Sequence, residues 1–168
     1  MMIGSLTGNN ILTVYLPTIF FCVAGFAVYD IRWRRVPDRA LAYFLPFAAL
    51  SPVLRIWPLR EAGLHPVWFL PVWADALMGA MLGFSVLLAA ALISGGSGMG
   101  GGDIKFAGVL GLIYGVSGMV LIFLIAAALA MPAALFIRRI SGKQMLSIPF
   151  LPFLACGCLV ATVGQLFG

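Results

Sequence analysis

The sequence predicts an all-α membrane protein, a bundle of six transmembrane helices in a single domain over residues 1–168, with both termini on the outer side. Hydrophobic residues make up 63% of the chain and charged residues only 9%, whereas about 25% is usual in soluble domains. Uncharged runs are long enough to cross a bilayer, and basic residues gather at their ends. We therefore expect the chain to act in or beside a lipid bilayer.

The spans are predicted from uncharged runs, because a helix rising 1.5 Å per residue needs about 20 apolar residues to cross the hydrocarbon core. Five runs are candidate spans, of which the second is short: residues 11–29, 40–54, 76–93, 106–137 and 145–167. No Lys or Arg precedes the first run, so it is expected to be a retained span and not a cleaved signal peptide. The second run contains Pro46 and Pro52, which bundled membrane helices tolerate. Residues 56–73 are expected to form a loop with interfacial tryptophans.

The run over residues 106–137 has two interpretations. It is either one overlong, tilted helix or two helices broken at the turn signal between Gly115 and Gly118. The positive-inside rule places clusters of basic residues in the cytoplasm, which requires an even number of crossings between the two clusters. Only a broken run satisfies this requirement. The clusters are Arg32, Arg34, Arg35 and Arg39, and then Arg138, Arg139 and Lys143.

Two carboxylates are expected to meet at the cytoplasmic face. Asp30 ends the first span and Asp103 follows the third, two crossings later. A lone ionised Asp near hydrocarbon costs about 2.5 to 3.5 kcal/mol, whereas two in contact hold one proton between them and titrate as a unit. Such a pair suits peptide hydrolysis, with one general base and one general acid. The competing class is a small transport or scaffold protein in which the same aspartates handle protons or cations.

The remaining ionisable residues are expected to be structural. Asp75 and Glu61 fall on the opposite face as ordinary solvated carboxylates, and His65 is a surface residue. Asp38 is expected to cap a helix or to form a loop ion pair among the arginines. No metal or cofactor is expected, because the chain has one histidine and no CxxC pair. Membrane topology explains the net charge of +5, so nucleic-acid binding is not expected.

The glycines beside Asp103 also have two interpretations. Gly100, Gly101 and Gly102 remove side chains there, so an extended substrate backbone can approach closely. Alternatively, the glycine-rich stretch is a flexible loop whose small residues pack helices. No GK[ST] follows the glycines, which excludes a P-loop. Lys105 either positions the Asp103 loop or extends its charged end to the cytoplasmic surface.

Three segments then resemble one family. GGGDIK, residues 100–105, is similar to the GxGDxK signature of type IV prepilin peptidases, which are membrane aspartic proteases. YDIRWRRVPDRAL, residues 29–41, resembles the family segment in which an aspartate ends a helix and Pro and then Asp or Asn follow. SIPFLPFLACG, residues 147–157, resembles the family's IPFGPF segment, with Leu151 in place of the usual glycine. The segments occur in the family's order.

The resemblance implies that Asp30 and Asp103 are the catalytic aspartates. Gly100, Gly101, Gly102 and Lys105 would belong to the active-site loop. Pro149 is expected to shape the last helix beside the site, a plain kink being the alternative. Asp38 matches a position filled by Asp or Asn in the family, which argues against a role in proton transfer.

The resemblance also implies the substrate and the location. Such enzymes remove the short basic leader of pilin-like precursors just before their hydrophobic helix. The protein would then be a multi-pass protein of the inner (plasma) membrane with its site facing the cytoplasm. The cysteine-bearing insertion of longer relatives is absent, so the chain looks like the short peptidases of tight-adherence pili or archaeal preflagellins. The presenilin-like class of GxGD proteases needs a Pro-Ala-Leu motif that this chain lacks.

Overall fold

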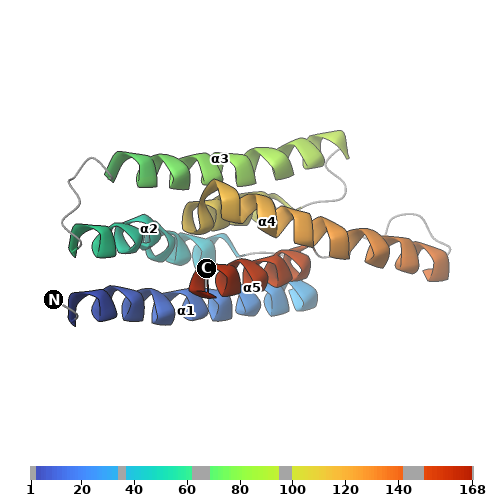
Figure 1. The fold of residues 1–168 in the computed structure, drawn as a ribbon. Helices are drawn as coiled ribbons and strands as arrows, with labels where there is room; N and C mark the ends of the chain where they lie inside the picture. Colours follow the sequence, from blue (N-terminus) through green and yellow to red (C-terminus); the bar gives the residue numbers. More distant parts are fainter. Residues whose placement is uncertain (1–2, 34–36, 62–68, 95–99, 142–149, 168) are drawn as a thin grey trace.

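The computed structural model describes residues 3–33, 37–61, 69–94, 100–141 and 150–167, and these residues are helical almost throughout. The helices are α1 (Ile3–Trp33), α2 (Asp38–Glu61), α3 (Phe69–Ile93), α4 (Gly101–Ser141) and α5 (Leu151–Phe167). Four are long and apolar enough to span a membrane, and α5 is a shorter apolar helix. Neighbouring helices in the sequence run in alternating directions (Figure 1). The predicted all-α membrane fold is therefore confirmed.

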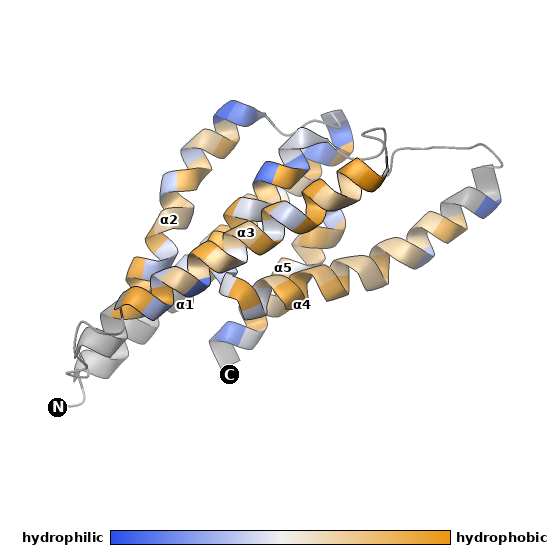
Figure 2. Cartoon of the chain, turned by 90° about the horizontal axis from the view of Figure 1, so that it is seen from above, coloured by the Kyte–Doolittle hydropathy of each residue, from blue (hydrophilic) through white to orange (hydrophobic). Residues whose placement is uncertain are grey.

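Helices α1 to α4 are longer than the apolar runs that predicted them. α2 continues to Glu61 and α3 begins at Phe69, so the prediction of a loop over residues 56–73 was wrong at both ends. Hydrophilic residues gather toward the helix ends, while hydrophobic residues occupy the middle (Figure 2). Proline is a weak breaker in membrane helices because neighbouring groups satisfy the freed carbonyls, and Pro46 and Pro52 both lie within α2.

α4 is broken at Gly115, as predicted. Gly115 has φ 71° and ψ −171°, a combination that only glycine adopts readily. A Cβ added at Gly83 of α3 would contact the Ala107 carbonyl and lie 3.1 Å from the Met119 Cε atom. One straight helix would separate residues 107 and 119 by about 18 Å, more than a methionine side chain spans. The chain therefore reverses at Gly115 (Figure 1).

This reversal divides α4 into a first arm, residues 101–114, and a second arm, residues 116–141. The described residues form five continuous helical elements, and α4 holds two arms that run in opposite directions. The predicted count of six crossings stays a prediction. Residues 145–149, which the sequence placed in the last span, lie outside the described residues.

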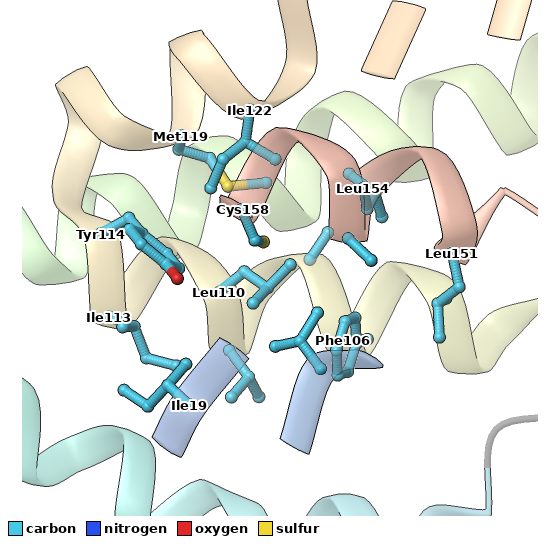
Figure 3. Close-up of a cluster of buried hydrophobic side chains, with 14 of the residues drawn as sticks. Ile19, Phe106, Leu110, Ile113, Tyr114, Met119, Ile122, Leu151, Leu154 and Cys158 are labelled. Atoms are coloured by element: carbon cyan, nitrogen blue, oxygen red, sulfur yellow. The ribbon is translucent and has the colours of Figure 1, made fainter. Parts of the chain in front are cut away.

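The first arm of α4 lies in the centre of the bundle. Most of its side chains are buried, and residues from α1, α5 and the second arm pack around them (Figure 3). A helix buried on most of its faces needs apolar side chains all round, which explains the long uncharged run. The largest buried side chains include Ile19, Phe106, Leu110, Ile113, Tyr114, Met119, Ile122, Leu151 and Leu154.

Small residues bring α3 and α4 into close contact. A Cβ added at Gly111 would overlap the backbone carbonyl of Gly79, and one added at Gly83 would overlap that of Ala107. Without side chains at these positions the two backbones approach closely, which is the usual way that membrane helices associate. These three glycines lie outside the stretch beside Asp103, for which helix packing was one of the two interpretations.

Candidate active site

Asp30 is buried in the last turn of α1, with 5% of its surface exposed. It continues a stripe of buried residues spaced three or four apart, a spacing that places them on one face of a helix. The pattern that packs α1 against the bundle therefore carries a carboxyl group into the interior. The other members of the stripe are Ile19, Val23 and Ala27.

Asp103 is buried in the first turn of α4, with 8% of its surface exposed. Its N–H donates to the Gly100 carbonyl at 3.0 Å, and its carboxyl group makes a backbone hydrogen bond with Gly100. A side chain at the third helical position characteristically reaches back in this way to the residue before the helix. The helix start therefore holds the carboxyl group in place. Asp103 begins the buried stripe that continues through Ala107, Leu110 and Tyr114.

The structure brings Asp30 and Asp103 close enough to interact electrostatically. Phe26 lies one turn before Asp30 and Phe106 lies one turn after Asp103, and their ring centroids are 5.2 Å apart. This aromatic contact joins α1 to α4 next to the two carboxyl groups. Two carboxyl groups in contact share a proton, so one can accept a proton while the other donates one. That Asp30 and Asp103 form such a pair, and that they are catalytic, stay predictions.

The glycines before Asp103 face open space. Gly100 and Gly101 are exposed and Gly102 is half-buried. A Cβ added at Gly101 would meet no atom within 4 Å, and one added at Gly100 would meet Asp103 Oδ2 at 3.9 Å. No described helix packs against Gly100 or Gly101, so this side of Asp103 has room for another chain.

Lys105 forms an ion pair with Asp38, with Nζ and Oδ1 2.8 Å apart. The pair joins the first turn of α4 to the first residue of α2, and both side chains are exposed. Asp38 thus forms an ion pair as expected, here with Lys105 of α4. This contact favours the interpretation that Lys105 helps to position the start of α4.

We expect this ion pair to contribute little to stability. An exposed ion pair stabilises a protein by about 0.2 to 1 kcal/mol, so Lys105→Met and Asp38→Asn should each lower the melting temperature slightly. The melting temperature of the double variant should fall no further than that of the single variants, since either change removes the contact. Thermal unfolding of the four proteins in detergent measures this coupling, and additive losses would contradict it.

The last predicted segment is described only in part. Pro149 lies outside the described residues. Leu151, which replaces the usual glycine of the family segment, is fully buried at the start of α5 and belongs to the core. Pro152 is half-buried in the same turn. The departure from the family motif therefore serves packing.

A second polar cluster lies at the Gly115 reversal. Asp75 of α3 accepts a hydrogen bond from the Val116 N–H at 3.0 Å and pairs with Arg55 of α2 at 3.5 Å. The Ile113 carbonyl accepts hydrogen bonds from the Arg55 guanidinium and, at 2.8 Å, from the Ser51 hydroxyl. The backbone N–H and carbonyl groups that the break leaves without a helical partner are thus hydrogen-bonded, as buried helix ends require. We call these contacts the Arg55–Asp75 cluster.

Sequence reasoning missed this cluster. Asp75 keeps 41% of its side-chain surface exposed, as a solvated carboxylate does, but it also pairs with Arg55 and accepts a hydrogen bond from the start of the second arm. The available signal was Arg55 itself, since an ionisable residue within a membrane helix needs a partner. The side chains of Glu61 and His65 lie outside the described set.

Comparison with known proteins supports the resemblance. Residues 15–135 match the model of the type IV leader peptidase family, a range that includes both aspartates. The chain is also similar to the prepilin leader peptidase/N-methyltransferase of Bacillus subtilis (strain 168), with 36% identity over 138 residues. That match covers 80% of this chain and 49% of the relative, so the chain spans about half the length of that relative.

No solved structure matches the chain, and the assignment therefore rests on sequence. The three motifs predicted this family, and its model matches most of the chain, from α1 into the second arm of α4. The chain belongs to the type IV leader peptidase family.

Proposed function

We propose that this multi-pass membrane protein is an intramembrane aspartic endopeptidase that removes the leader of type IV pilin-like precursors at the cytoplasmic membrane face. One observation carries the proposal: two buried carboxyl groups, Asp30 and Asp103, interact electrostatically although they come from distant parts of the chain. Open space beside Gly101 gives a peptide access to Asp103. The family and the named relative support peptidase activity of this kind.

The chemistry requires one ionised and one protonated carboxyl group. The ionised group takes a proton from a water molecule, whose oxygen attacks the scissile carbonyl carbon, while the protonated group donates its proton to the carbonyl oxygen. Collapse of the tetrahedral intermediate breaks the C–N bond, and the departing amine receives a proton. The peptide must be unwound at this point, since a helical amide is shielded by its own hydrogen bonds.

The proposed topology has six crossings in one domain, with both termini on the outer side and the aspartates facing the cytoplasm. Arg32 lies in the last turn of α1, two residues after Asp30. Arg139 lies at the end of α4, which extends toward the same end of the bundle as the C-terminus of α1 (Figure 1). Positive residues favour the cytoplasmic side. Arg55 is at the other end, where Asp75 pairs with it.

Reporter fusions test this topology. Fusions after residues 33 and 141 should report the cytoplasm, and one between residues 62 and 68 should report the periplasm. A periplasmic signal from a fusion after residue 33 would exclude the proposed orientation.

The function is tested by incubating the purified protein with a pilin-like precursor from the same genome and analysing the products by mass spectrometry. We expect one cut between the basic leader and the apolar helix. The transport alternative predicts an intact precursor and ion flux in proteoliposomes. Placement of both aspartates at one end of the bundle, and not near its middle, does not favour that alternative.

Cleavage should depend on pH with a maximum. Low pH protonates the carboxyl group that must act as base, and high pH ionises the one that must act as acid, so the initial rate should fall on both sides. Initial rates measured across the pH range on the same precursor provide the check. A rate that rises steadily with pH would instead indicate a single essential base.

A further inference from the structure

An apolar groove of about 690 Å³ runs between α1 and α2, which lie side by side (Figure 1). We call it the α1–α2 groove. Its lining is almost wholly apolar and includes Thr18, Cys22, Gly25 and Tyr29 of α1 and Tyr43 and Phe47 of α2.

The groove exists because small residues on both helices leave the space between them unfilled. Gly25 is exposed, and a Cβ added there would meet no atom within 4 Å. Ala40 across the groove is also small. Tyr43 is 83% exposed at the rim. The groove is therefore open on one side along both helices.

The groove ends at the candidate active site. Tyr29 and Pro37 line it, and they directly precede Asp30 and Asp38. Phe26, which also lines the groove, contacts Phe106 of α4 one turn from Asp103, with ring centroids 5.2 Å apart. A molecule in the groove would thus have one end beside both buried carboxyl groups.

The occupant is best explained as an apolar helix. Both walls are helices, whose backbone groups are bonded internally, and the Thr18 hydroxyl donates to its own Val14 carbonyl at 2.7 Å. The groove therefore offers no ladder of partners to an extended peptide, whose backbone would stay unsatisfied in an apolar setting. A helix satisfies its own backbone. The stretch from Thr18 to Tyr29 is about 16 Å long, enough for one face of about three turns.

We propose that the α1–α2 groove binds one face of the apolar helix of the precursor, so that the bond before this helix reaches Asp30 and Asp103. This inference rests on the proposed function and adds the surface that recognises the substrate. The aspartates then cut, while the groove selects a precursor with an apolar helix and sets how far that helix extends toward the site.

Native cysteines allow a direct test. Cys22 lines the groove, while Cys156 is exposed on α5 and Cys158 is buried. We would oxidise the Asp103→Asn variant with precursors that each carry one cysteine along the apolar helix. Disulfides should form with Cys22 at every third or fourth precursor position, the repeat of a helix face. They should persist with Cys156→Ser and disappear with Cys22→Ser. Crosslinking through Cys156 alone would overturn the proposal.

A matched pair of glycine variants gives a functional test. Gly25→Leu fills the groove, whereas Gly164→Leu on α5 adds the same side chain at another exposed glycine with no atom within 4 Å of its Cβ position. Gly25→Leu should raise KM for the precursor by about tenfold or more, the signature of lost substrate binding. Gly164→Leu should leave this KM unchanged.

The outcomes separate this proposal from the proposed function. If the unaltered protein does not cut the precursor, the peptidase proposal fails. If it cuts, but Gly25→Leu keeps the original KM and Cys22 forms no disulfide, only the groove proposal fails. The groove would then be a site for bilayer lipid.

Discussion

Replacing Asp30 or Asp103 with asparagine is expected to reduce precursor cleavage at least about 100-fold, because each variant lacks one of the two groups that exchange protons with the water and the scissile amide. Asparagine keeps the shape of the side chain and removes one of two neighbouring, buried carboxyl groups. The melting temperature should therefore stay the same or rise. Lost activity at equal or greater stability would indicate chemistry and not folding.

Asp38→Asn is the matched control for these variants. Asp38 is also an aspartate near this end of the bundle, but it is exposed and pairs with Lys105. Quantifying cleaved precursor by mass spectrometry, beside thermal unfolding in detergent, should give cleavage within a few-fold of the unaltered protein for this variant. Normal cleavage by Asp30→Asn or Asp103→Asn would end the proposal of a paired aspartic mechanism.

Replacing Gly115 with alanine is expected to destabilise the protein by roughly 2 to 6 kcal/mol. The backbone at φ 71° and ψ −171° costs a non-glycine residue about 1 to 3 kcal/mol. The added Cβ would also overlap the Asp75 carboxylate, and such overpacking costs about 1 to 3 kcal/mol. Displaced from this position, Asp75 would lose its bonds to Val116 and Arg55, so the reversal of α4 would loosen.

Gly108→Ala serves as the control, since an added Cβ there meets Phe84 at an ordinary 3.5 Å and alanine favours helix. It should be neutral or slightly stabilising in thermal unfolding experiments. A Gly115→Ala protein as stable as Gly108→Ala would show that the chain does not reverse at Gly115 in the way described.

Local sequence signals were enough for the main features of this protein. Apolar runs indicated membrane helices, because burial in lipid requires them wherever the chain crosses. The turn signal at Gly115 marked where the long run could break, and the positions of the two basic clusters favoured a break. The backbone at Gly115 indeed leaves the helical conformation. Counting crossings between Asp30 and Asp103 predicted that they meet, and both are buried at that end.

Helix ends were harder to predict, as the helical residues at both ends of the expected loop over residues 56–73 show. Proline and tryptophan near a membrane boundary resemble loop signals, yet a bundle accommodates them within helices. Likewise, the leucine at position 151 in place of the family's glycine is explained only by the core in which it is buried.

By itself, the sequence determined that the chain enters a membrane and that it carries two carboxyl groups at the ends of spans. It also determined the family. Each of these properties depends on a short stretch of consecutive residues. Only the tertiary structure decided that Lys105 pairs with Asp38, that Arg55 and Asp75 bind the broken ends of α4, and that Gly25 opens a groove. These features join residues on different helices. Their partners depend on how the helices pack against one another, which no local pattern records.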